Sequence, residues 1–294
     1  MAQAKVNNSW FWEILWAILI VAAVFAAQRA LQQSSSPSVS WRKVPLDGHR
    51  AGALPVTADN VADALGTFSD EAYMTPGGVA YPSGSAIASV ASEMIEVQPL
   101  MSHLKKVVAH SARMMPNLRT EPDLPLGNFV TDAMRSFGSS YFHAPMDFAI
   151  ANYGGIRVPM PEGAVTLDDI MSMFPFKNYV VYCKVPGSGL LQLFEQLAET
   201  KAFQAVSGAR VAVKDHKLVS AEIGGEPIEP SRLYNVCTID FLLDGGDNIR
   251  IGALATDVTL SNVLMRDMML EYLSGLEARG EVIDYKPEGR VVME

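Results

Sequence analysis

A short apolar run that ends in an asparagine and a glycine pair restricts the fold of this chain more than any other stretch. Residues 147–157 read D-F-A-I-A-N-Y-G-G-I-R, and F-A-I-A has the length and composition of a buried strand. Gly154 and Gly155 predict a sharp turn at which a ligand can approach the backbone. Asn152 offers a hydrogen-bond donor and an acceptor, and Arg157 offers a cationic fork suited to phosphate or carboxylate. A plain strand-to-loop turn with a surface arginine explains this stretch, taken alone, equally well.

Composition limits the classes of protein to which the chain can belong. Its 294 residues suffice for one or two domains with a sizeable core. A formal net charge of -9 argues against a nucleic-acid-binding protein, which normally carries a basic face. Cys183 and Cys237 lie in runs typical of strands and predict two buried free thiols. A disulfide stays open if the two strands are neighbours in an oxidising compartment.

The N-terminus predicts export. Residues 10–27 are apolar except for one glutamate, a length between a signal-peptide core and a full membrane span. We expect a membrane anchor with its N-terminus in the cytoplasm, or else a cleaved signal peptide. A buried soluble helix fits less well, because no other segment is so uniformly apolar. Either main interpretation places the remaining chain in the cell envelope, on the periplasmic or extracytoplasmic side.

The rest of the chain divides into an arm and a folded domain. The predicted units are residues 1–30 (signal anchor or signal peptide), 31–88 (linker and irregular arm) and 89–294 (folded domain). Within the domain we expect strands at 148–151, 179–185 and 233–239, a hairpin around 215–216, and helices at 89–115, kinked at Pro99, and from Ser261 to Arg279. This alternation predicts an α+β fold, a mixed β-sheet with helices packed on its faces.

Four motifs in a fixed order carry a resemblance. They are Gly127-Asn128 at a helix start, N-Y-G-G-I-R at 152–157, F-P-F-K-N at 174–178, and D-F-x-x-x-G-G-D at 240–247. Each motif alone is weak, but their order resembles the C-terminal, substrate-binding domain of the 5′-nucleotidase family. That family includes periplasmic UDP-sugar hydrolases and surface AMP-hydrolysing enzymes. The resemblance covers roughly residue 89 to the C-terminus.

The resemblance implies a nucleoside-binding site. Two phenylalanines of the family's domain sandwich the base, and they match Phe176 and Phe241 here. Stacking on an aromatic ring is worth about 1–3 kcal/mol per base in nucleic-acid-binding proteins. Asp247 matches the acid that binds the ribose hydroxyls, and Asn152 matches an asparagine near the base or sugar. Without the resemblance, core packing is the better explanation of either phenylalanine, and Asp247 also suits a turn.

Two arginines match the family's phosphate-binding groups. Arg157 matches an arginine that holds the substrate phosphate, and Arg119 stands where a second one often lies. Two departures bear on the pocket. Tyr153 replaces a small residue ahead of the glycine pair, where it narrows the backbone approach or adds a contact. Lys177 replaces a glycine and brings charge to the pocket edge.

The family's chemistry implies a second component. Hydrolysis there belongs to an N-terminal metallophosphatase domain, whose two divalent metals are held by D-x-H, G-N-H-D/E and G-H-x-H motifs. That set of motifs is missing from these residues, and the five histidines are scattered. We therefore expect no metal cofactor in this chain, no catalytic residue, and hydrolysis only with a separate metallophosphatase subunit. A nucleotide-binding receptor and a degenerate scaffold with a vestigial pocket are the alternatives.

Overall fold

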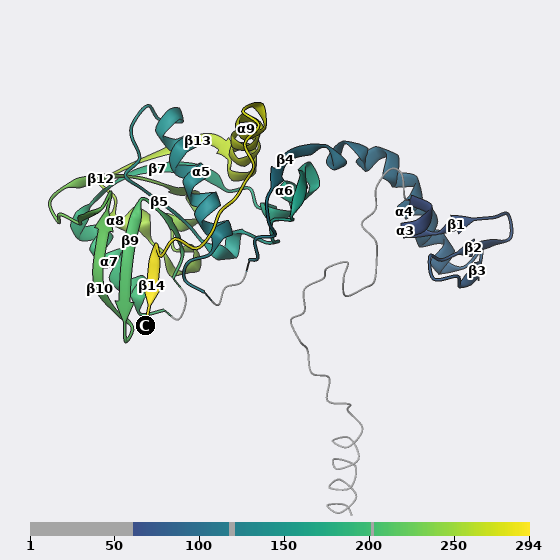
Figure 1. Cartoon of the computed structure of the whole chain (residues 1–294), viewed down its shortest axis with the longest axis horizontal. Coiled ribbons are helices and arrows are strands. Elements are labelled where there is room, and N and C mark those ends of the chain that lie inside the picture. The colour runs from purple at the N-terminus through teal and green to yellow at the C-terminus, as the bar shows by residue number, and fades with distance from the viewer. Residues whose placement is uncertain (1–60, 118–120, 201–202) are drawn as a thin grey trace, which may run out of the picture. The chain divides into compact units, whose positions relative to one another are not determined.

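The protein is a mixed α+β structure, as the sequence predicts (Figure 1). The computed structural model describes residues 61–117, 121–200 and 203–294. The predicted anchor at residues 10–27 and Arg119 lie outside these residues. Within the described ranges, no helix is both long and apolar enough to cross a membrane.

Residues 61–105 form helices and a small sheet where the sequence predicts an irregular arm followed by a long helix. Tyr73, Ala88 and Ala91 make a small buried cluster that holds this sheet to its helix. Ser85 caps that helix, its hydroxyl accepting a hydrogen bond from the Ala88 N–H at 3.2 Å. The elements are α3 (Val61–Leu65), β1 (Thr67–Phe68), β2 (Ala72–Met74), β3 (Ala80–Pro82), α4 (Ala86–Met101) and η1 (Ser102–Lys105).

The predicted helix over 89–115 is wrong beyond residue 105. Pro99 lies in the last turn of α4, and η1 follows the helix. Residues Val107–Ser111 are strand β4, which pairs antiparallel with β6 (Gly163–Thr166). The run V-V-A-H-S has the β-branched content of a strand, and this outweighs the helical spacing of the apolar residues before it.

A five-stranded mixed sheet forms the centre of the domain. Its order is β13-β7-β12-β5-β8, in which β12 and β5 are parallel and the other neighbours are antiparallel. All four residues of β5 are buried, as expected for an apolar central strand. The strands are β5 (Phe148–Ala151), β7 (Tyr179–Pro186), β8 (Ala205–Ser207), β12 (Leu233–Ile239) and β13 (Asp257–Leu264).

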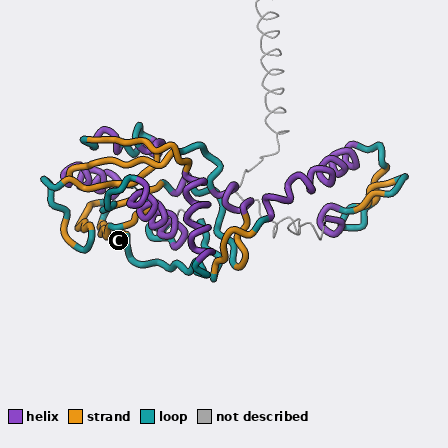
Figure 2. The backbone as a smooth tube through the Cα atoms, turned by 90° about the horizontal axis from the view of Figure 1, so that it is seen from above, coloured by secondary structure: helices purple, strands orange, loops and turns teal. Residues whose placement is uncertain are grey.

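Helices cover both faces of this sheet (Figures 1 and 2). Helix α5 (Pro125–Tyr141) lies on one face beside α9 (Met265–Ala278), and its Gly138 sits against Cys237 of β12. Helix α7 (Gly187–Ala198) lies on the other face, where the Phe194 ring meets the Phe148 ring edge-on at 5.4 Å. These two layers bury most of the apolar core.

The predicted final helix begins too early. Ser261 does not cap it, because residues Asp257–Leu264 form strand β13 and α9 starts at Met265. The segment D-V-T-L-S-N-V-L is rich in β-branched residues and pairs with β7, which explains the strand. The Ser261 hydroxyl instead accepts a hydrogen bond from the Val263 N–H at 3.1 Å.

A second sheet contains the predicted hairpin. Strands β9 and β10 join through Asp215 and His216, whose φ angles of 49° and 59° are the left-handed values of a tight hairpin turn. The sheet has the order β11-β10-β9-β14, so the C-terminal strand closes one edge. Its strands are β9 (Ala209–Lys214), β10 (Lys217–Ile223), β11 (Glu226–Pro227) and β14 (Val291–Met293).

Short helices connect these layers. Thr166 and Asp169 form a capping box at the start of α6, as the threonine before two acids predicts. The remaining elements are α6 (Leu167–Met173), η2 (Tyr153–Gly155), η3 (Asp240–Leu242), η4 (Gly246–Asn248) and α8 (Ile251–Leu254).

Both cysteines are free and buried, although their strands are neighbours. Cys183 pairs with Val236, one residue before Cys237, so the two thiols point to opposite faces of the sheet. This register rules out the disulfide that the sequence left open. Burial raises the pKa of the Cys183 thiol to about 12 and that of Cys237 further.

Candidate functional site

Three predicted segments meet at one end of the central sheet. Ile239, the last residue of β12, pairs with Val180 near the start of β7. Strand β5 runs parallel to β12 in a register that brings Ala151 level with Ile239. The loops after β5, before β7 and after β12 therefore lie at the same end of the sheet. They carry Asn152, Phe176 and Phe241 respectively, so the fold brings three of the four motifs together.

Asn152 is a buried polar residue at this end of the sheet, with 4% of its surface exposed. Its amide Nδ2 donates to the Asp247 carboxylate Oδ2 at 2.7 Å. Its Oδ1 is buried and has no hydrogen-bond partner among the residues that the structure describes. A Cβ at Gly155 would lie 2.9 Å from Oδ1, so a glycine is needed beside this acceptor. An orphaned buried acceptor is costly, and a donor from a ligand would satisfy it.

Asp247 sits in a turn that few residues favour. Its φ of 50° is left-handed, and the preceding Gly245 has a φ of 109°. This geometry points the Asp247 carboxylate at Asn152, ninety-five residues earlier in the chain. The Gln196 side chain of α7 donates to the Asn248 carbonyl at 2.6 Å and holds the same loop.

Arg157 and Phe176 lie side by side. The Arg157 guanidinium donates to the Gly154 carbonyl at 3.1 Å, and its central carbon is 5.8 Å from the centre of the Phe176 ring. The Phe176 ring is 45% exposed, which is unusual for a phenylalanine beside a strand. Core packing therefore does not explain this ring.

Phe241 is also half-exposed, at 44%, and it begins the loop after β12. Its ring lies against the backbone of Gly246, where an added Cβ would collide with it. Among the ring contacts of the described residues, none joins Phe241 to Phe176. The predicted stacking of both rings on one base therefore stays a prediction.

A narrow pocket of about 20 Å³, open to solvent, lies at this end of the sheet. Asn152, Gly155 and Phe176 line it, together with two residues that were not predicted as binding groups, Asn178 and Phe174. Both belong to the F-P-F-K-N motif, so their signal was present in the sequence. The other lining residues are apolar and come from α5, β5, the position after η2, β12 and α9, namely Val130, Ala151, Ile156, Ile239 and Met265.

Tyr153 does not line this pocket. It is buried, and its hydroxyl accepts a hydrogen bond from the Leu124 N–H at 3.3 Å. Burial raises the pKa of this phenol to about 12. Any side chain at Gly127 would meet the Tyr153 ring, which explains the glycine of the Gly127-Asn128 motif. Lys177 is exposed beside Phe176.

Asn128, the other half of that motif, has a structural partner. Its Nδ2 donates to the Asp123 carboxylate at 2.7 Å and to the Lys286 carbonyl at 3.4 Å. The helix itself starts at Pro125, two residues before the predicted start. Within the described ranges, no group of three or more histidine, cysteine, aspartate or glutamate side chains is arranged to hold a metal ion.

Comparisons with known proteins point to one family. Residues 107–255 match the family model described as 5′-nucleotidase, C-terminal domain. The UshA protein of Escherichia coli is 31% identical over 105 residues, which are 34% of this chain and 19% of that protein. A 5′-nucleotidase of Vibrio cholerae is 30% identical over 108 residues, 35% of this chain and 20% of that protein. The chain thus spans about a fifth of the length of these relatives.

Solved structures agree with the sequence matches. A 5′-nucleotidase precursor from Thermus thermophilus superposes with a TM-score of 0.62 at 25% identity, covering 75% of this chain and 45% of that one. The NAD nucleotidase of Haemophilus influenzae shares the fold, with a TM-score of 0.53 at 17% identity and coverages of 76% and 48%. The chain belongs to the 5′-nucleotidase C-terminal domain family.

Proposed function

We propose that this chain is the nucleotide-binding component of a two-component 5′-nucleotidase in the cell envelope. It binds the nucleoside and phosphate of a nucleotide, while a separate metallophosphatase subunit with two divalent metals hydrolyses the ester. In this proposal, residues 10–27 hold the chain in the membrane, and residues 89–294 form the binding domain outside the cytoplasm.

The buried, unpartnered Oδ1 of Asn152 carries the proposal. Asn152 lines a pocket with one half-exposed phenylalanine on its wall, and its Nδ2 donates to the Asp247 carboxylate. A carboxylate held in this way accepts hydrogen bonds from two neighbouring hydroxyl groups, as a ribose presents. Arg157 lies beside the same phenylalanine and supplies a cation for a phosphate.

The aromatic groups add affinity but little selectivity. Phe176 and Phe241 each expose part of an aromatic ring at the same end of the sheet, and every nucleobase can stack on such a ring. We propose that both rings contact one base after the η3–η4 loop adjusts around it. Gly154, Gly155 and Arg119 complete the proposed binding set on the phosphate side.

Calorimetry with AMP, adenosine and a UDP-sugar tests the binding step on the full-length chain. We expect AMP to bind, and the Phe176→Ala and Phe241→Ala variants each to weaken binding by about tenfold, in line with the loss of one stacking contact. Leu233→Ala is the matched control, because Leu233 is a 51% exposed apolar residue at the other end of β12. A wild-type chain that binds none of the three ligands contradicts the proposal and leaves the degenerate scaffold.

Mixing tests the catalytic step. Membranes that contain the chain are used to capture associated proteins, and the captured metallophosphatases are assayed for AMP hydrolysis with and without the chain. We expect hydrolysis to rise when the chain is added and to stay low with Phe176→Ala. AMP binding without any captured metallophosphatase, and without a gain on mixing, would contradict the two-component assignment and support a nucleotide receptor.

A further inference from the structure

A second pocket lies on the far side of α5, and it shares no residue with the nucleoside pocket. It has a volume of about 310 Å³, is open to solvent, and most of its wall is polar or charged. Helix α5, the β8–β9 junction, the β10–β11 turn and the segment before β14 all contribute. The lining residues are Asp132, Arg135, Ser207, Gly208, Ala209, Arg210, Gly225, Glu288 and Arg290.

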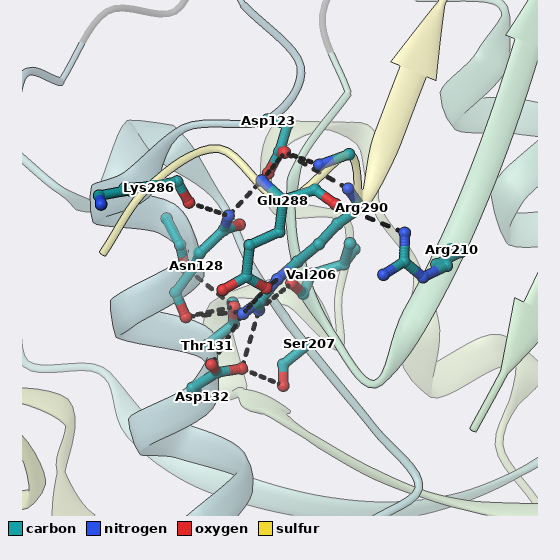
Figure 3. A network of polar contacts seen from close by, with 12 residues as sticks. Asp123, Asn128, Thr131, Asp132, Val206, Ser207, Arg210, Lys286, Glu288 and Arg290 are labelled. Atoms are coloured by element: carbon teal, nitrogen blue, oxygen red, sulfur yellow. Dashed lines mark hydrogen bonds and ion pairs between the residues drawn. The ribbon is translucent and has the colours of Figure 1, made fainter. Parts of the chain in front are cut away.

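The floor of this pocket is a satisfied ion-pair network (Figure 3). The Arg290 guanidinium meets the Asp132 carboxylate with two hydrogen bonds, of 2.8 and 2.7 Å. The Glu288 carboxylate lies 2.9 Å from the same guanidinium. The Ser207 hydroxyl donates to Asp132 at 2.5 Å. Arg290 is therefore saturated, and it occupies both carboxylates of the pocket.

Two further guanidinium groups have no such partner. Among the described residues, neither Arg135 nor Arg210 forms an ion pair with a carboxylate. The Arg210 side chain is exposed, and within the described ranges it donates to the Glu288 carbonyl at 3.4 Å. Arg135 is half-buried, and its Nη1 lies 3.0 Å from the place of a Cβ at Gly208.

Burial makes the missing partner of Arg135 significant. A guanidinium that is partly withdrawn from water loses hydration, and this loss is normally offset by hydrogen bonds to an anion. The Asp147 carboxylate pairs instead with the Arg232 guanidinium and the Asn235 N–H, at 2.9 and 2.8 Å. Gly208 has a φ of 80° and packs closely between the Asp147 carbonyl and the Arg135 guanidinium, where a Cβ would collide with the carbonyl oxygen.

The charges of the pocket sum to a positive value in an acidic protein. Three arginines stand against Asp132 and Glu288, while the whole chain carries a formal charge of -9. Two planar guanidinium groups that line one pocket suit a tetrahedral oxyanion, which can accept several hydrogen bonds at once. We propose that this pocket binds a phosphate group through Arg135 and Arg210, at a site separate from the nucleoside pocket.

The test titrates inorganic phosphate into the full-length chain by calorimetry at constant ionic strength. All variants carry Arg157→Gln, which weakens phosphate binding in the nucleoside pocket. We expect binding to persist in that background and to fall about tenfold with either Arg135→Gln or Arg210→Gln, the loss of one charge-assisted contact. Arg279→Gln is the control, because Arg279 is exposed and pairs with Glu281 outside the pocket.

A variant that is expected to bind phosphate more tightly distinguishes an effect on this site from damage to the fold. Glu288→Gln removes one negative charge from the pocket and keeps an oxygen for Arg290, so phosphate should bind at least about twofold more tightly. Glycerol phosphate is titrated in parallel, to distinguish free phosphate from the phosphate group of a larger molecule. Phosphate binding that disappears with Arg157→Gln alone, or that ignores Arg135→Gln and Arg210→Gln, overturns the proposal. AMP binding by the wild-type chain is scored separately, so failure here leaves the nucleotide assignment standing.

Discussion

The position of an exposed phenylalanine ring, and so its contact with a ligand, can depend on a single neighbouring residue. Gly246 supports the Phe241 ring, since a Cβ at this position would collide with both the ring and the Phe241 carbonyl. We expect Gly246→Ala to displace Phe241 and to weaken AMP binding by about tenfold, the value of one stacking contact. Gly84→Ala is the control, because nothing lies within 4 Å of its added Cβ. Calorimetry measures both variants, and equal AMP affinities would show that Phe241 does not contact the base.

A buried phenol gives a pH signature. The pKa of Tyr153 is raised from 10.0 to about 12 by burial, so the folded state disfavours its ionised form. Tyr153 then stabilises the fold fully below pH 10, and this contribution is lost as pH rises towards 12. We expect the free energy of unfolding to fall less steeply between pH 10 and 12 in Tyr153→Phe than in the wild type. Parallel urea titrations measure the two slopes, and identical slopes would contradict the burial of this phenol.

The sequence predicted the bounds of an element best where its residue types favour a single kind of secondary structure. Apolar β-branched runs predicted β5, β7 and β12 to within a residue, and Thr166 predicted the start of α6. It was least informative at Tyr153, because whether a side chain points into a core or a pocket depends on Gly127, twenty-six residues earlier. The register that joins Asn152 to Asp247 is likewise a product of tertiary packing.

Among the helices and strands, the segment at residues 288–290 connects helix α5 to the C-terminal strand β14. The Asp123 carboxylate accepts from the N–H groups of residues 288–290 at 2.7, 2.5 and 3.3 Å, next to the Arg290–Asp132 pair. The Arg290 side chain is 9% exposed. Removing it leaves a partly buried carboxylate without its cation, and breaking a buried pair in this way costs about 3–5 kcal/mol.

We therefore expect Arg290→Met to lower the free energy of unfolding by several kcal/mol in urea titrations. Arg279→Met, which breaks a fully exposed pair with Glu281, should leave it unchanged within error. Adding Asp132→Asn to Arg290→Met should recover part of the loss, since the stranded charge is then gone. A stability of Arg290→Met equal to that of Arg279→Met would show that the network does not hold the C-terminal segment.

At the scale of the molecule, the family segment 107–255 depends on the C-terminal residues beyond it. Strand β14 pairs with β9 through Val291–Met293, and Ile283 bridges to Ser111 of β4. Both Val291 and Ile283 are buried in the main core. The C-terminal segment thus completes two sheets that begin inside the family segment.

We expect a chain that ends at residue 282 to lose cooperative unfolding, because it lacks β14, Arg290 and the partners of Asp123. Hydrogen exchange of β9 and β4 measures the effect directly, since both strands lose a neighbour. A chain that ends at residue 293 is the control. Equal protection of β9 in the two shortened chains would show that the family segment folds without its C-terminal segment.

We propose that one nucleotide binds at the end of the sheet shared by β5, β7 and β12. A crystal structure of the full-length chain with AMP would locate the nucleotide. We predict that the base lies between the rings of Phe176 and Phe241, with a ligand donor on the Asn152 Oδ1 and the phosphate at Arg157. AMP bound elsewhere on the molecule, with the Asn152 Oδ1 still unpartnered, would contradict the claim.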